Sequence, residues 1–385
     1  MTKKILFSLF LVTISLLCAA EQKPQPPRKY IAPKLENPDP WSMIVVPDTQ
    51  IYTAKSQNHG ILDMMFTWIT SNKKNMKIQQ VLCVGDLVNQ NDTGSLTKPN
   101  DWELVCEEQW EAFSRLAERL DDRVPYAFCT GNHDYGPRNS EDFRTKYGKY
   151  FKSNRNPLSR EQLVECCPNY FGENTLENVA YEFTAPAPDN RKFLILVLQF
   201  CPTDAMINWA KKLTDAPRFA DHFVILLTHS FIRGDGSRFA KEGYTIARKG
   251  GNSPEQIYRK LVATSKNIRM VICGHAFGRK RWDQSAALSM TKNGAGKDVA
   301  QMLFNTQAID GHWVGNGGDG WLRILEFMPD KKTIKARTFS PLFAISPSTN
   351  HLAWQTDDRN EFTIVLEQCI TLFWRSFLQL EEIFT

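Results

Sequence analysis

This chain of 385 residues lacks a large excess of positive or negative charge. It also lacks a regular cysteine spacing and internal repeats. Its 47 Lys and Arg nearly balance its 42 Asp and Glu, and the net charge of +5 includes Lys3 and Lys4 of a segment that we expect to be removed. No broad basic surface for nucleic acid is therefore expected. The nine cysteines follow no spacing rule, so the sequence assigns no disulfides, although export would permit them.

Long apolar runs are also missing. The run from Ile5 to Leu17 is shorter than the ~20 residues that a membrane span needs. It follows Lys3-Lys4 and precedes the small residues Cys18-Ala19-Ala20, a pattern typical of a secretory signal over residues 1–20. We expect a secreted or periplasmic protein whose mature chain begins at Glu21. An uncleaved membrane anchor is the alternative.

What is present supports a globular protein with a core, because 42% of the residues are hydrophobic and 11% aromatic. Residues 21–40 carry six prolines and read as a linker. We expect the main domain over 41–345, and a strand with an apolar tail over 346–385. The tail is predicted to pack on its own domain, with a membrane-surface helix as the alternative.

Apolar runs of strand length alternate with amphipathic segments. We expect strands over 41–46, 81–84, 124–129, 193–200, 223–227 and 268–273, and helices over 58–73, 102–120, 203–212 and 253–263. Ser253 and Pro254 have the character of a helix cap and first position. Residues 135–180 read as an insertion outside the sheet. The runs 302–304 and 322–325 read as strands of a more antiparallel second sheet.

One turn, Gly131-Asn132-His133-Asp134, directly follows a strand-like run. Asn132 offers an oxygen ligand, His133 a proton donor or acceptor, and Asp134 a partner that orients the imidazole. A helix-capping loop turn is the competing interpretation of these four residues alone.

Four further strand ends carry the same kind of residue. Asp48, Asp86, His229 and His275 each follow an apolar run within a few residues, and three of the seven histidines lie at such ends. Parallel strands place these ends at one edge of a sheet. Carboxylate, amide and imidazole ligands suit divalent ions of the Mn, Fe, Zn or Mg type. Asp86 is the best bridge between two ions, and a pair ~3.5–4 Å apart is suited to phosphoester hydrolysis.

In order and spacing, this series resembles the calcineurin-like metallophosphoesterase superfamily. The match covers about 41–277, and the opening Pro47-Asp48-Thr49-Gln50 followed by Tyr52 is similar to an exported branch. The resemblance implies an α/β four-layer sandwich of two mainly mixed β-sheets flanked by helices. It further implies these roles: Asp86, Asn132, His229 and His275 hold one ion, Asp48 and Asp86 contribute to the other, His133 is the general acid, and Asp134 fixes its ring.

Two positions depart from that pattern. Gln50 and Phe277 stand where most of the superfamily has histidines, so the first ion loses two imidazoles and gains at most one amide oxygen. Its affinity should fall, or shift towards Mg²⁺ or Ca²⁺. A one-metal enzyme is the alternative to a two-metal one.

Other residues near the motifs have weaker assignments. His312, Asp310 or Asp319 could replace a ligand, and Arg279, Lys280 or Arg281 could meet a phosphate, although loop or surface roles are equally open. Asn89 and Asn91 could orient a water or belong to a surface turn.

The sequence thus favours a hydrolase of small phosphomonoesters or phosphodiesters, without nucleic-acid or membrane partners. The alternative is a catalytically silent, metal-containing protein that binds a phosphorylated or glycan ligand. A membrane-surface adaptor that uses the tail is a third reading.

Overall fold

The computed structural model describes residues 29–36, 39–93 and 103–366. The predicted signal, half of the Pro-rich linker and the apolar tail after Glu367 lie outside these ranges. Within them, no helix has the length and apolar character needed to cross a membrane.

Two seven-stranded sheets form the centre of the molecule. The first has the order β13-β12-β11-β1-β2-β3, with β14 also paired to β12, and the second has the order β4-β5-β6-β7-β8-β10-β9. The strands of the first sheet are β1 (Trp41–Val46), β2 (Ile78–Cys83), β3 (Tyr126–Phe128), β11 (Leu322–Phe327), β12 (Thr333–Phe339), β13 (Trp354–Gln355) and β14 (Phe362–Val365). Those of the second are β4 (Leu163–Cys166), β5 (Val179–Thr184), β6 (Lys192–Leu198), β7 (Phe223–Thr228), β8 (Ile268–Cys273), β9 (Ala286–Lys292) and β10 (Asp298–Phe304).

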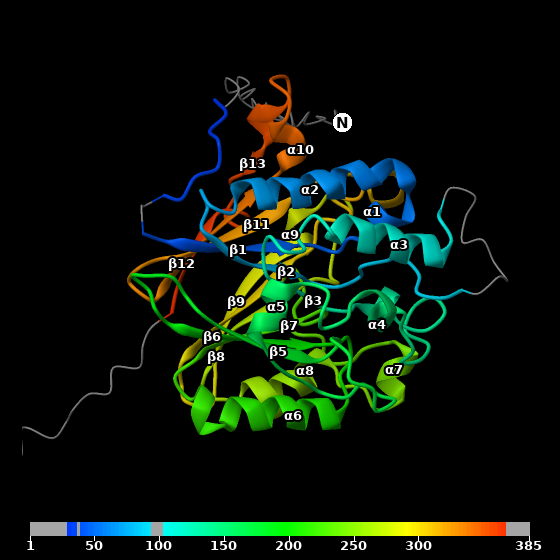
Figure 1. Ribbon diagram of the computed structural model, residues 1–385, viewed down its shortest axis with the longest axis vertical. Coiled ribbons are helices and arrows are strands. Elements are labelled where there is room, and N and C mark those ends of the chain that lie inside the picture. The colour runs from blue at the N-terminus through cyan, green and yellow to red at the C-terminus, as the bar shows by residue number, and fades with distance from the viewer. Residues whose placement is uncertain (1–28, 37–38, 94–102, 367–385) are drawn as a thin grey trace, which may run out of the picture.

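Helices cover the outer faces of both sheets. Figure 1 shows α2 and α3 over the first sheet, and α6 and α8 under the second. The helices are α1 (Gln50–Ala54), α2 (His59–Asn72), α3 (Cys106–Ala117), α4 (Tyr147–Tyr150), α5 (Pro157–Gln162), α6 (Asp204–Asp215), α7 (Thr245–Arg248), α8 (Pro254–Ile257), α9 (Trp282–Ser285) and α10 (Pro341–Ala344). The expected four-layer α/β sandwich is confirmed.

The layers are held together by the apolar runs that the sequence shows. Between the sheets, Trp41 stacks on Phe327 with ring centroids 4.3 Å apart and meets Phe193 edge-on at 5.0 Å. Such contacts add to the free energy gained by burying the rings. As predicted, Ser253 caps α8: its hydroxyl accepts a bond from the Gln256 N–H, with Pro254 at the first helical position.

Two topological expectations were wrong. Residues 135–180 do not stay outside the sheets, because β4 pairs with β5 and forms an edge of the second sheet. The four residues of β4 are too few to show a clear period. The runs 302–304 and 322–325 belong to different sheets, since β10 pairs with β8 and β11 with β1. Apolar runs of this kind do not reveal which neighbour they pair with.

Connectivity decides where the strand ends lie. Strands β1, β2 and β3 are mutually parallel in the first sheet, and β6, β7, β8 and β10 in the second. Their carboxyl ends are where open α/β sheets place ligands.

Candidate metal centre

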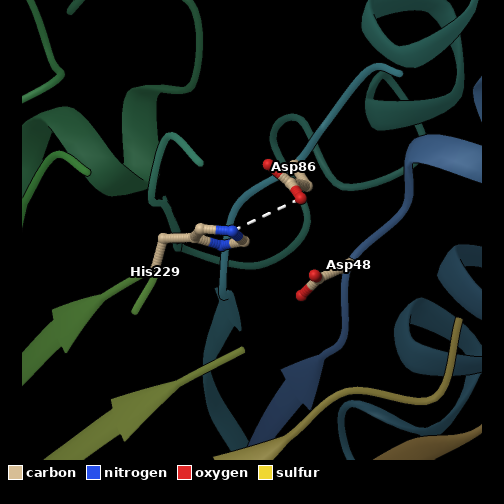
Figure 2. A group of neighbouring side chains, drawn as sticks. All are labelled: Asp48, Asp86 and His229. Carbon is tan, nitrogen blue, oxygen red and sulfur yellow. Dashed lines mark ion pairs between the residues drawn. The ribbon is translucent and has the colours of Figure 1, made fainter. Parts of the chain in front are cut away.

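The five polar strand ends come together, but from two sheets. Asp48, Asp86 and Asn132 follow β1, β2 and β3 of the first sheet, whereas His229 and His275 follow β7 and β8 of the second. The expectation of a single sheet edge was therefore wrong. Figure 2 shows Asp48, Asp86 and His229 directed into a common space, and their ligand atoms lie within 4.8 Å of one another.

Four donors form what we call the imidazole side: Asp86, Asn132, His229 and His275. The Asn132 Oδ1 lies 3.0 Å from His229 Nε2 and 2.8 Å from His275 Nδ1, and these two nitrogens are 3.2 Å apart. His229 Nε2 is 3.3 Å from Asp86 Oδ2. Potential ligand atoms of four side chains thus lie close to one another.

The neighbours of these donors fix which atoms are presented. His229 Nδ1 lies 2.8 Å from the carbonyl oxygen of Val84, which can only accept, so Nδ1 carries a proton and neutral His229 offers the Nε2 lone pair. The Asn132 Nδ2 donates to Asn139 Oδ1 at 2.6 Å, which leaves Oδ1 facing the imidazoles. In metalloproteins, hydrogen bonds to the other polar atom of a ligand side chain orient the atom that binds the metal.

The charges at this point call for a cation. Burial opposes a charged imidazole, but the carboxylates of Asp86 and Asp48 raise the pKa of His229 to about 10. Burial and the neighbouring His229 lower the pKa of His275 to about 3. Burial disfavours the Asp86 carboxylate, yet His229 and His133 outweigh it and hold the Asp86 pKa well below its usual range. A divalent ion of the kind that takes oxygen and nitrogen ligands fits these donors.

Backbone geometry brings Asp86 into this space. Asp86 has φ of 50° and His275 has φ of 69°, a region that non-glycine residues seldom adopt. Gly131 lies so close that a Cβ there would be 2.1 Å from Asp86 Oδ1. Only glycine at position 131 permits this approach.

Amide groups surround the Asp48 carboxyl group, and we call this set the amide side: Asp48, Gln50, Asn305 and Gln307. Asp48 Oδ2 accepts bonds from Asn305 Nδ2 at 2.7 Å and Gln307 Nε2 at 3.3 Å, and Gln50 Nε2 donates to Gln307 Oε1. Gln50 Oε1 is buried, with no hydrogen-bond partner among the described residues. Burial raises the pKa of Asp48 well above its usual value. An orphaned amide oxygen beside a buried carboxyl suits a hard, oxygen-preferring ion.

Asn305 and Gln307 were missed in the sequence. Both are buried and directly follow β10, so they obey the same strand-end rule as the five predicted residues. The signal in the sequence is the apolar run Met302-Leu303-Phe304, which ends at Asn305.

His133 lies beside the imidazole side, and its backbone N–H donates to Asp86 Oδ1 at 2.9 Å. Its ring Nδ1 is 2.5 Å from the carbonyl oxygen of Asn89. The expectation that Asp134 orients this ring was wrong. The buried Asp134 carboxylate instead accepts backbone N–H bonds from Gly131 at 2.7 Å, and from Leu87 and Val88. It ties the turn after β2 to the turn after β3.

The weaker site predictions fall around this centre. His312 is buried, stacks on Phe277 with centroids 5.0 Å apart, and has a pKa lowered to about 4 by burial and by Arg279, His133 and Lys55. It is outside the group of converging ligand atoms. Arg279 is exposed, and Arg281 forms a surface ion pair with Asp283 at 2.6 Å.

The remaining predicted residues form hydrogen bonds within loops. Asp310 accepts from the N–H of His312 and of Gly317, and Asp319 accepts from Asn316. The Asn91 side chain bonds the Gly136 carbonyl and the Lys146 N–H. These contacts shape the loops around the centre. The seven described cysteines are free thiols.

Comparisons of sequence and of structure identify proteins that are similar to this chain. The uncharacterized protein YvnB of Bacillus subtilis (strain 168) is 26% identical over 309 residues, which are 79% of this chain and 20% of YvnB. The chain thus spans about a fifth of the length of this curated relative. The solved structure of GAP50, the anchor in the inner membrane complex of Plasmodium, superposes with a TM-score of 0.41 and 10% identity over 86% of this chain and 90% of that one.

The decisive match is to a family model. The model of the calcineurin-like phosphoesterases matches residues 43–276, more than half of the chain. That span runs from β1 to the turn after β8 and so includes every donor of the imidazole side. Because sequence, layers and converging donors agree, we conclude that this chain belongs to the calcineurin-like phosphoesterase family.

Proposed function

We propose that this protein is an exported, metal-dependent hydrolase of small phosphomonoesters or phosphodiesters. The family supports a metal-dependent phosphoesterase in general terms. The observation that carries the proposal is the place of His133, whose backbone N–H donates to Asp86 and whose imidazole lies near enough, against the effect of burial and together with His229, to lower the pKa of that carboxyl. A purely structural ion needs no ionisable side chain beside it.

The chain's residues divide the work as follows. Asp86, Asn132, His229 and His275 would hold one divalent ion, and Asp48, Gln50 and Asp86 the second. Bound ions polarise phosphoryl oxygens and lower the pKa of water. Since Nδ1 of His133 faces a carbonyl oxygen, it keeps its proton, and Nε2 is the nitrogen that can donate a proton to the leaving oxygen.

Export is part of the proposal and rests on residues 1–20 alone. Expression of the full chain in a secreting host should yield a mature protein that begins at Glu21, as read by N-terminal sequencing. An intact Met1 in membrane fractions would favour an anchor.

A catalytically silent binding protein is the second possibility. Gln50 and Phe277 favour it, because the amide side lacks imidazoles and its amides already bond one another. Such a protein would bind a phosphorylated or glycan ligand and turn over none.

Metal analysis and turnover of nitrophenyl phosphate mono- and diesters test the proposal. We expect bound divalent metal and hydrolysis in the wild type. His133→Ala should lower kcat by roughly 10² to 10⁴ without loss of metal, whereas the remote control His351→Ala should keep full activity. Bound metal without turnover of any ester would favour the silent protein, and absence of bound metal would refute both readings.

A further inference from the structure

A cavity of about 650 Å³ adjoins the imidazole side. Its lining includes Arg233, Phe239, Tyr244, His275, Phe277 and Arg359. Because His275 also contributes a donor atom to the metal centre, a molecule in the cavity lies next to the proposed reaction site. Pockets with aromatic walls and a few polar groups are typical of small-molecule sites.

Aromatic rings form the wall nearest the metal centre. Phe239 and Tyr244 meet the His275 ring with centroids 5.6 and 5.8 Å away, each at an angle of 67°. Both rings therefore pack against the His275 imidazole, which belongs to the imidazole side of the metal centre.

The Phe277 ring, by contrast, is partly open to solvent. It is 38% exposed, unusual for a phenylalanine. His312 stacks on one face of its ring at an angle of 18°. The ring is thus held in place on one side while the rest of its surface is left to the cavity.

The lining also carries charged side chains of both signs: Arg233, Arg359, Asp235 and Asp283. The Arg233 guanidinium lies 4.0 Å from the Phe239 ring centroid and donates to the Arg238 carbonyl. Arg359 donates to the carbonyl oxygens of Gly234 and Ala286. The carboxylates of Asp235 and Asp283 in the same lining offset these two charges, so the aromatic rings rather than a net charge select the ligand.

From these contacts we infer that the cavity binds a planar aromatic ring, aryl or nucleobase, carried by the substrate phosphoester, and that Phe277 is its main contact. The inference rests on the proposed function and names its substrate class. Position 277, which is a histidine in most of the superfamily, would here supply a contact with the ring of the substrate. His312 is a positioning residue that holds Phe277.

Binding of stable phosphonates tests this without turnover. Titration calorimetry on the full chain with Mn²⁺ should show phenylphosphonate binding roughly tenfold more tightly than methylphosphonate, given the usual worth of one aromatic stack. Phe277→Ala should remove most of that difference, and Phe277→Leu should remove part of it. Phe171→Ala, which removes another exposed phenylalanine that does not line this cavity, should leave it intact.

Kinetics then separate this inference from the proposed function. For phenyl phosphate, Phe277→Ala should raise KM roughly tenfold with little change in kcat, while methyl phosphate should be hydrolysed as before. Equal binding of the two phosphonates, or a preference unchanged in Phe277→Ala, would overturn the aromatic pocket even if esters are hydrolysed. Selective binding of phenylphosphonate without turnover of any ester would instead refute the hydrolase alone.

Discussion

The imidazole side and the amide side of the centre are built from the same kind of strand end but are not equivalent. On the imidazole side the Asn132 and His229 ligand atoms face each other because their other polar atoms bond groups outside the site. On the amide side the polar groups bond one another, as Gln50 does with Gln307. The comparison teaches that donors turned towards one another by outside partners differ from amides that bond one another and leave a single oxygen, Gln50 Oε1, without a partner among the described residues.

The largest effect should come from breaking the imidazole side. His229→Ala removes a donor from the imidazole side, and we expect loss of the tightly held ion and a fall in kcat/KM of more than about 100-fold, since even outer partners of metal ligands are worth about 10- to 100-fold. Bound metal and turnover measure this. His59→Ala, which removes a half-buried histidine away from the centre, should retain both, and full metal content in His229→Ala would remove the distinction between the sides.

The next effect concerns the frame that both sides share. Asp134→Ala leaves the buried N–H groups of Gly131, Leu87 and Val88 without their acceptor. We expect the free energy of unfolding to fall by about 3 kcal/mol, measured by urea denaturation in the presence of a chelator. The surface variant Asp142→Ala should change it little. An unchanged Asp134→Ala protein would mean that the two turns hold each other without this carboxylate.

A smaller effect should appear on the amide side. Gln307→Ala frees both Gln50 and Asp48 from their partner, and we expect the weaker ion to lose affinity by about tenfold while the tighter ion is unaffected. Titration calorimetry with Mn²⁺ resolves the two classes of site, and Gln79→Ala is the matched control. Equal losses at both sites would show that the sides act as one unit.

The smallest effect is expected at a surface contact outside the metal centre, that of Glu107. Bonds from Lys149 and Tyr150, with help from Lys146, lower the pKa of Glu107 to about 2 and join α3 to α4. Because these groups are largely exposed, Glu107→Gln should cost less than about 1 kcal/mol of unfolding free energy.

The sign of its pH dependence follows from the lowered pKa. The folded-state pKa lies below the unfolded value of about 4.3, so the stabilisation is present above that pH and is lost as the pH falls towards 2. Urea denaturation of wild type and Glu107→Gln should therefore converge in acid. A difference that persists at pH 2 would contradict this origin.

The five strand ends could be predicted because each apolar run stops at a polar residue, and the layers followed from the family resemblance that these ends carry. The sequence did not predict that these ends come from two sheets, since the runs before Asp86 and His229 look alike while their partners are set by the whole topology. The contact of the His133 ring with the Asn89 carbonyl oxygen could not be predicted from the sequence either. A backbone oxygen has no signature in the side-chain pattern.

The division of the imidazole side between the sheets has a consequence for how the protein melts. Asp86 and Asn132 belong to the first sheet and His229 and His275 to the second, so an ion held by all four is a crosslink between the two halves of the sandwich. Occupancy at about 100 times the dissociation constant would add about 2.7 kcal/mol to the native state. Heat would then have to dismantle both sheets in a single cooperative transition.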